Sequence, residues 1–177
     1  MKNFLLSSLL ILGVTISAQA EEWTLFPKDN QQNNSNPHYG LAFIGGSSDL
    51  SGHDSSSDLY GVEFSLVCPL VQASEHTIRQ NISLTKVNKN SFNMYTIEAN
   101  PHYLFQVEES TYLGVGPSLG ISKIESDDTV VSIGMGASIR KDITKKLFLG
   151  AEFRKTYATN SDFSNVRFIG KVGYFFK

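Results

Sequence analysis

Nine ionisable residues stand at the polar positions of segments in which apolar and polar residues otherwise alternate: Glu63, Arg79, Glu98, His102, Arg140, Glu152, Arg154, Arg167 and Lys171. Alternation with a period of two is typical of β-strands, so these side chains share the face opposite the apolar one. Charges enclosed in a low-dielectric interior must pair, because an isolated buried charge is costly. We therefore predict an interior network in which the three glutamates meet Arg154 and Lys171 at mid-height and block a continuous water path. Solvated charges without fixed partners are the alternative, because the pattern does not fix how the strands align.

Nucleophilic catalysis would need a serine, a histidine and an acid within hydrogen-bond reach of one another. Residues 53–55 (His-Asp-Ser) have these types, but they lie in a polar loop where fixed geometry is not expected. His102 stands on the polar face, and His38 and His76 have no matching serine and acid nearby. We therefore predict no catalytic residues. An enzyme is kept as an alternative, because active-site residues need not be contiguous in sequence.

Three neighbouring acids, Glu125, Asp127 and Asp128, could bind a divalent cation through their carboxylate oxygens. No ligand spacing supports this site, and a hydrated loop is the favoured interpretation. The chain also lacks paired cysteines and a glycine-rich phosphate loop, and its 15 basic residues are balanced by 17 acidic ones. We expect no metal, no cofactor and no nucleic-acid partner.

The first twenty residues have the parts of a secretory signal peptide in order. Lys2 precedes an apolar run over residues 4–16, and Ala18-Gln19-Ala20 forms a small-residue cleavage site. The run is interrupted by polar residues and is shorter than the ~20 apolar residues of a bilayer-spanning helix. Residues 21–37 are rich in Asn and Gln and show no periodicity, which predicts a flexible periplasmic arm. One ordered domain, 38–177, follows.

The domain alternates with period two in eight segments separated by clusters of Ser, Asp, Asn, Gly and Lys. No long amphipathic helix is predicted. The sequence therefore predicts an all-β domain with strands at about 39–47, 59–68, 77–86, 94–107, 113–122, 131–140, 147–157 and 166–176.

The apolar face of such strands points either to a shared core or outward to lipid, and both arrangements give the same alternation. Here the polar face is rich in Gly and Ser and lacks the Lys and Glu coat of a surface in water. A lumen enclosed by about eight strands has room for small residues and a few charges. We therefore predict an outward, lipid-facing set: Tyr60, Phe64, Ile82, Tyr95, Ile97, Tyr103, Phe105, Leu119, Ile133, Phe153, Phe168, Tyr174 and Phe176. A soluble periplasmic β-barrel is the alternative.

Aromatic residues also recur near the strand ends, as expected for the two interfacial girdles of a membrane barrel. We assign to these girdles Tyr39, Tyr60, Tyr95, Phe105, Tyr112, Phe148, Tyr157 and Tyr174. The lone Cys68 is expected to be a small apolar strand residue on the same face as Tyr60.

Several segments resemble the eight-stranded outer-membrane barrels of the OmpA/OmpX and opacity-protein type. The resemblance is carried by the glycine-spaced segment 112–120 (YLGVGPSLG), by 134–144 and 147–154, and by the aromatic end Tyr174-Phe175-Phe176. It implies a monomeric, eight-stranded antiparallel up-and-down transmembrane β-barrel in outer-membrane lipid and lipopolysaccharide of a Gram-negative bacterium. It also implies assembly by the barrel-assembly machinery, which reads a terminal aromatic residue; here Lys177 follows Phe176.

With a periplasmic N-terminus, the exposed loops would be about 48–58, 87–93, 123–129 and 158–165, and the turns 69–76, 108–110 and 142–146. The resemblance then favours a non-enzymatic surface protein with an envelope-structural role, or one that contacts a host or cell-surface ligand through its loops. A narrow pore for small solutes and a lipid A-modifying barrel enzyme are further alternatives.

Overall fold

The computed structural model describes residues 23–25, 39–51, 56–68, 71–73, 77–89, 92–125 and 129–176. The predicted signal peptide and most of the predicted arm lie outside the described residues, as do residues 53–55, Asp127, Asp128 and Lys177. His38 and His76 lie outside them too. Among the described residues, no helix is long and apolar enough to cross a membrane.

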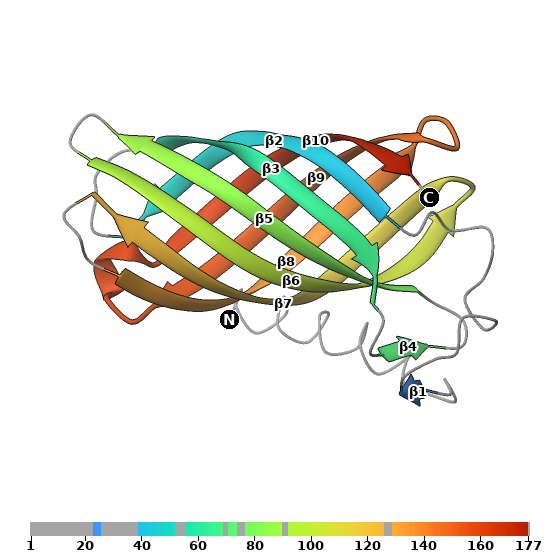
Figure 1. The fold of residues 1–177 in the computed structure, drawn as a ribbon, viewed down its shortest axis with the longest axis horizontal. Helices are drawn as coiled ribbons and strands as arrows, with labels where there is room; N and C mark the ends of the chain where they lie inside the picture. Colours follow the sequence, from blue (N-terminus) through green and yellow to red (C-terminus); the bar gives the residue numbers. More distant parts are fainter. Residues whose placement is uncertain are drawn as a thin grey trace, which may run out of the picture.

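Eight strands of the described residues close into an antiparallel barrel, and each pairs with the strand that follows it around the barrel (Figure 1). The last strand, β10, pairs with the first, β2, with Phe176 opposite Tyr39. This confirms the predicted fold. The strands are β2 Tyr39–Leu50, β3 Ser57–Val67, β5 Thr77–Lys89, β6 Phe92–Glu108, β7 Thr111–Ile124, β8 Thr129–Asp142, β9 Leu147–Ala158 and β10 Asn165–Phe176.

Two further strands of three residues each, β1 Trp23–Leu25 and β4 Val71–Ala73, form a separate antiparallel pair with Trp23 opposite Ala73. The sequence analysis predicted an arm and a turn for these segments, and no strand. Three residues are too few for alternation to be detected, so this pairing has no signal in the sequence.

The connections lie at two opposite ends of the barrel (Figure 1). At the loop end, strands are joined by 51–56, 90–91, 125–128 and 159–164; at the turn end, by 68–76, 109–110 and 143–146. The barrel also begins and finishes at the turn end, at Tyr39 and Phe176. In the turn at 109–110, Ser110 adopts a φ of 64°, a left-handed conformation suited to a tight hairpin.

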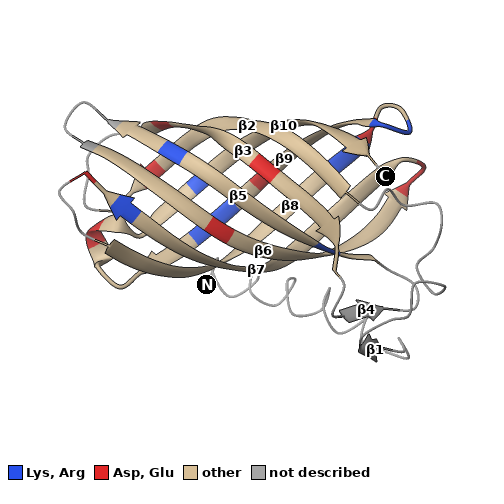
Figure 2. Cartoon of the chain, viewed as in Figure 1, with Lys and Arg blue, Asp and Glu red and all other residues tan. Residues whose placement is uncertain are grey.

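Most of the apolar side chains of the strands point away from the barrel axis. Phe43, Ile133 and Phe168 are 73%, 63% and 61% exposed, whereas Glu98 and Arg167, at inward positions, are 1% and 0% exposed. Of the thirteen residues that we assigned to lipid contact, ten are exposed, and Phe64, Tyr103 and Phe105 are half-buried. The outer surface is therefore apolar, which is the arrangement of a transmembrane barrel and not of a soluble one. Figure 2 shows that charged residues occupy only a few positions on the strands between the two ends.

Two of the aromatic residues that we assigned to the girdles do not belong there. Phe148 is 5% exposed, and its ring stacks inside the barrel on Phe175, with centroids 4.5 Å apart. Tyr112 lies against the inward guanidinium of Arg140, whose Cζ is 4.3 Å from the ring centroid. The alternation decides the direction of a side chain, and both residues stand at inward positions of their strands.

Cys68 is a further correction, because it is buried although we predicted it on the same face as Tyr60. Ile78, which shares the outward face of its strand with Ile82, is buried too. β3 ends at Val67, so the alternation no longer applies at Cys68. The Cys68 backbone N–H instead donates to the carbonyl of Ile78 at 2.8 Å, which ties the two residues together at the turn end.

Candidate functional site: the closed interior of the barrel

Six of the nine predicted interior residues form one connected cluster in the middle of the barrel, the central ion cluster: Glu63, Glu98, Glu152, Arg154, Arg167 and Lys171. All are buried, none more than 9% exposed. Arg154 on β9 is at its centre, donating from Nη1 to Glu98 Oε2 at 2.8 Å and from Nε to Glu152 Oε1 at 2.7 Å. Arg167 donates from Nη1 to the same Oε2 of Glu98 at 2.5 Å.

Lys171 on β10 extends the cluster to Glu63 on β3, two strands away around the barrel. Its Nζ lies 2.6 Å from Glu63 Oε2 and 2.6 Å from Glu152 Oε2. The charges therefore alternate in sign along one continuous path: Arg167, Glu98, Arg154, Glu152, Lys171 and Glu63. Three carboxylates are balanced by three cations, so the cluster as a whole is neutral.

This balance explains how so many charges are tolerated in one interior. Each ion loses its hydration on burial, which costs several kcal/mol. Only close partners of opposite charge with good geometry offset this desolvation cost. The residues come from β3, β6, β9 and β10, and only β9 and β10 are neighbours, so closure of the barrel brings the whole cluster together. The cluster thus links opposite walls of the barrel.

Small residues on β7 make room for the cluster. A Cβ on Gly120 would lie 2.7 Å from Glu98 Cγ and 2.8 Å from Ser132 Oγ, closer than real Cβ atoms approach other atoms. Gly120 pairs directly with Glu98 in the register of β6 and β7. Gly120 therefore leaves space for the larger charged side chain of Glu98 on the neighbouring strand β6.

His102 lies beside the central ion cluster without completing a catalytic triad. Its Nδ1 is 2.9 Å from Ser138 Oγ, but its Nε2 is 3.9 Å from Glu152 Oε1, beyond hydrogen-bond reach. Glu152 is already held by Arg154 and Lys171. The three residue types are present, but the acid does not orient the histidine as nucleophilic catalysis requires.

The two remaining predicted residues, Arg79 and Arg140, lie nearer the turn end. Arg79 Nη2 donates to Ser65 Oγ at 3.0 Å, and Arg140 Nε lies 2.9 Å from Asp142 Oδ1. Each guanidinium carbon is 5.1 Å from the ring centroid of Phe175. Together with Phe148, Phe175 forms an aromatic plug near this end of the lumen.

A cavity of about 420 Å³, which includes open space at its mouth, lies between the central ion cluster and the aromatic plug. Charged side chains and aromatic rings share its wall. It is lined by residues that include Glu63, Arg79, His102, Arg140, Phe148 and Phe175.

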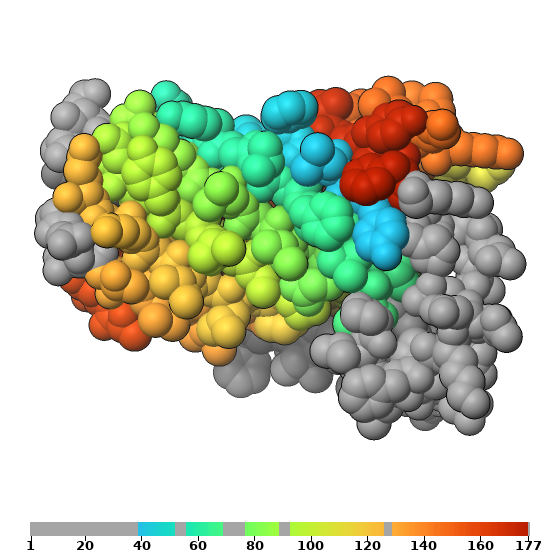
Figure 3. Space-filling view, in the orientation of Figure 1, coloured from blue at the N-terminus to red at the C-terminus, as the bar shows by residue number. Residues whose placement is uncertain are grey.

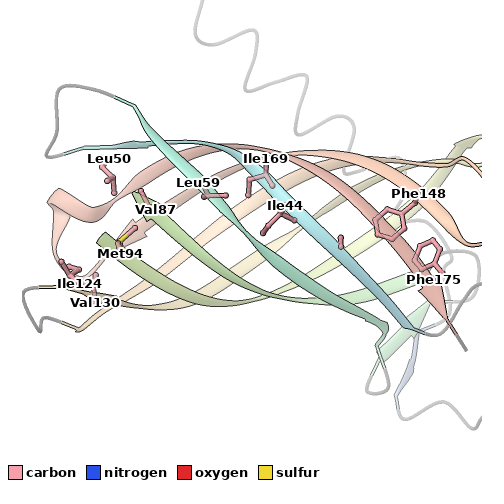
Figure 4. Packing of buried hydrophobic residues seen from close by; sticks show 11 residues of the cluster. Ile44, Leu50, Leu59, Val87, Met94, Ile124, Val130, Phe148, Ile169 and Phe175 are labelled. Carbon is pink, nitrogen blue, oxygen red and sulfur yellow. The ribbon is translucent and has the colours of Figure 1, made fainter. Parts of the chain in front are cut away.

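The loop end of the lumen is filled by six apolar side chains that the sequence analysis did not single out. This apolar cap consists of Leu50, Leu59, Val87, Met94, Ile124 and Val130, none more than 4% exposed. Phe163, on the short 3₁₀ helix η2 (Ser161–Phe163), packs against it. In Figure 4, most of the apolar cap gathers at one end of the barrel and Phe148 and Phe175 lie at the other.

The alternation of apolar and polar residues contains a signal for the apolar cap. Each of its residues stands at an inward position of its strand near the loop end. Leu59 and Met94 lie within the predicted strands, where the alternation predicts a polar side chain. The other four, Leu50, Val87, Ile124 and Val130, lie one to three residues beyond the predicted strand ends, so the apolar layer appears only when the alternation is extended into the loops.

The sequence matches no family model and no curated protein at a significant level. Solved structures match over most of the chain. Neisserial surface protein A is 16% identical, with a TM-score of 0.59 and coverage of 78% of this chain and 96% of that one. The N-terminal barrel domain of Pseudomonas aeruginosa OprF is 13% identical, with a TM-score of 0.51 and coverage of 80% and 100%. The chain has the fold of the eight-stranded outer-membrane barrels.

A computationally designed transmembrane β-barrel shares this fold as well, at 13% identity, a TM-score of 0.50 and coverage of 78% of this chain and 95% of that one. A barrel designed from first principles has no evolutionary link to this chain. The likeness therefore reflects the geometry that eight membrane-spanning strands require. At these identities the comparisons establish the fold alone. The roles of the interior and of the loops follow from the residues of this chain.

Proposed function

We propose that this protein is an integral outer-membrane surface protein that neither conducts solutes nor catalyses a reaction. The fold and the apolar outer surface support insertion in a bilayer, and the predicted signal peptide supports export. We further propose that the chain acts as a monomer and that the assembly machinery recognises Phe176, which is exposed on the outer face.

The observation that carries this proposal is the closed lumen. Three barriers lie in series along the barrel axis: the apolar cap at the loop end, the central ion cluster in the middle and the aromatic plug near the turn end. Apolar constrictions exclude water, and charges that are held in buried ion pairs bind a passing ion poorly. This arrangement argues against the narrow pore that the sequence left open.

The loop end carries ordered structure that could present a binding surface. Asn160 caps η2 by accepting from the backbone N–H of Asp162 at 3.2 Å, and Ser51 N–H donates to the Ser164 carbonyl at 2.8 Å. Glu125 Oε2 accepts from both the backbone and the side-chain amide of Asn93, at 3.1 and 2.8 Å. These contacts support a role in which the barrel holds its loops in place for an envelope-structural function or for contact with a host or another cell.

A lipid-modifying activity finds no support on the outer surface. His102 is the histidine of the described strands, and it faces the lumen at 2% exposure. A lipid substrate at the outer surface would not reach it. The non-enzymatic role is therefore the one that the described residues favour.

Planar-bilayer recordings of the purified mature chain test the closed lumen. We expect no steady single-channel conductance under voltages at which an open porin conducts. A large and stable conductance from the wild-type protein would overturn the non-conducting role.

Protease shaving of intact cells and binding assays test the surface role. Replacement of residues 159–164 by a short glycine linker should remove cleavage or binding at the loop end, whereas the same replacement of 143–146 at the turn end should not. Binding that is unchanged by the loop replacements would remove the adhesion interpretation while leaving the envelope-structural one.

A further inference from the structure

The cavity between the central ion cluster and the aromatic plug has a basic wall. Arg79 on β5, Arg140 on β8 and Lys171 on β10 line it together with one carboxylate, Glu63 on β3. Lys171 Nζ lies 2.8 and 2.6 Å from the two carboxylate oxygens of Glu63, so these two charges offset each other. The two arginines are therefore the cations that this wall presents to a ligand.

The guanidinium groups of Arg79 and Arg140 lie against one aromatic ring. Each guanidinium carbon is 5.1 Å from the ring centroid of Phe175, and the two positive charges are close enough to repel each other. Arg79 donates from Nη2 to Ser65, and Asp142 lies along one edge of Arg140, 2.9 Å from Nε and 3.4 Å from Nη2. A guanidinium carries five N–H donors in one plane, so it can hold a second acceptor beside the first.

A histidine adds a polar group to the same wall. His102 and Ser138 both line the cavity, with His102 Nδ1 2.9 Å from Ser138 Oγ. His102 is 2% exposed, and its Nε2 has no hydrogen-bond partner among the described residues. A buried polar atom without a partner is costly, so it points to a ligand or a water molecule at this place. When the Ser138 hydroxyl donates to Nδ1, the proton of the neutral ring is on Nε2, which is then a donor to an anion.

The remaining wall of the cavity is largely apolar near the turn end. Leu104, Phe148 and Phe175 line it, and the two phenylalanine rings stack with their centroids 4.5 Å apart. A ligand in this cavity therefore meets guanidinium groups on one side and apolar side chains on another. Part of the volume of about 420 Å³ is open space at the mouth, so the enclosed part suits a small molecule.

The layers of the lumen decide how such a ligand enters. The central ion cluster and the apolar cap lie between the cavity and the loop end, so the cavity is reached from the turn end. Figure 3 shows that side chains of β3, β5 and β6, coloured teal to yellow-green, cover this wall of the barrel closely. A ligand therefore enters along the barrel axis and not through this wall.

We propose that this cavity binds a short-chain carboxylate, with the carboxylate group between Arg79 and Arg140 and the alkyl group against Leu104 and Phe148. A guanidinium matches the two oxygens of a carboxylate, and such charge-assisted hydrogen bonds are about twice as strong as neutral ones. A negative charge between the two arginines also offsets their mutual repulsion. This role goes beyond the proposed function, because a cavity that opens at one end binds a ligand without conducting it.

Saturation-transfer NMR on the purified mature chain in neutral detergent tests the proposal, because it detects weak binding. The probes are butyrate, butyramide, which has a similar size and no charge, and inorganic phosphate. We expect butyrate to bind and butyramide not to bind. Loss of one charged hydrogen-bond partner should weaken butyrate binding about tenfold or more in R79Q and in R140Q. L104F keeps every charge and enlarges a side chain of the apolar wall, so it should weaken butyrate binding as well.

The matched control is K141Q, which removes the neighbouring cation from an exposed position on the outer face and should leave butyrate binding unchanged. Heat-modifiable gel mobility establishes which variants are folded, and L104F carries the test if an arginine variant is not. Equal binding of butyrate and butyramide, or unchanged butyrate binding by the folded cavity variants, would overturn the proposal. Displacement of butyrate by an equal concentration of phosphate would overturn the choice of an alkyl carboxylate. Conductance is measured separately, so this proposal and the proposed function can fail independently.

Discussion

Replacement of Glu98 by glutamine is a direct test of the central ion cluster. The change preserves side-chain volume and removes one negative charge. Glu98 Oε2 is 2.8 Å from Arg154 Nη1 and 2.5 Å from Arg167 Nη1, so two cations lose the same partner. Arg154 keeps Glu152, whereas Arg167, at 0% exposure, is left without a carboxylate partner among the described contacts.

The expected loss follows from that imbalance. Breaking a buried ion pair by neutralising one member typically costs about 3–5 kcal/mol, because the remaining charge stays buried without compensation. We expect E98Q to lower the free energy of unfolding by about this amount. The assay is urea unfolding of the protein in lipid vesicles, followed by the fraction that keeps the mobility of the folded form on unheated gels.

A second variant separates charge imbalance from a general loss of packing. E98Q/R167Q removes one charge of each sign and leaves two carboxylates facing two cations, so we expect it to recover at least about 1 kcal/mol relative to E98Q. E109Q, in the exposed turn at 109–110, is the control and should change stability by less than about 0.5 kcal/mol. A loss below about 1 kcal/mol for E98Q, or a double variant less stable than E98Q, would refute the argument that the pairs hold the walls together.

Further expectations concern the lumen and its neighbours. In the same unfolding assay, G116A should lower the free energy of unfolding by about 1–3 kcal/mol or more, because its Cβ would lie 1.8 Å from the backbone oxygen of Pro101. The control is G170A, whose Cβ would lie 3.6 Å from the nearest atom, and it should be neutral or stabilising. M94A should cost about 2–5 kcal/mol by opening a void in the apolar cap, and a change below about 0.5 kcal/mol would show that the cap is loosely packed. Ser138 should resist labelling by a fluorophosphonate over hours, because Glu152 does not orient His102; rapid labelling that H102A abolishes would contradict the non-enzymatic proposal.

The sequence predicted the barrel well because the period of two is strictly local. Each strand of the barrel was located within three residues at either end, and the outward direction of residues such as Ile97 and Phe168 followed from the alternation alone. Partners across the lumen could not be predicted in the same way. The contact between Lys171 and Glu63 joins residues 108 positions apart and depends on the register of β10 with β2 and of β2 with β3. A shift of two residues at either pairing would leave every alternation intact and change the partners.

The sequence also failed where residue type was taken as evidence of position. Phe148 was assigned to an interfacial girdle because it is aromatic and near a strand end, but its inward position places it on Phe175 inside the lumen. Its neighbours Leu147 and Leu149 are the exposed ones, at 39% and 44%. Position in the alternation therefore carries more weight than chemical character.

The outer and inner surfaces of this barrel differ in where charged and apolar side chains lie along the axis. Outside, apolar side chains occupy the middle, and tyrosine and lysine residues such as Tyr60, Lys86 and Tyr95 lie near the loop end. Inside, the charges lie in the middle beside Ile44 and Ile169, and apolar or aromatic side chains fill both ends. The outer order follows from the bilayer, whose centre excludes charge. The inner order follows from water, which would enter at both ends, hydrate the charges and weaken their pairing if the ends were polar. The apolar cap and the aromatic plug thus keep the central ion cluster in the low-dielectric surroundings where its pairs are strongest, and the same exclusion of water is the basis of the proposal that the lumen does not conduct solutes.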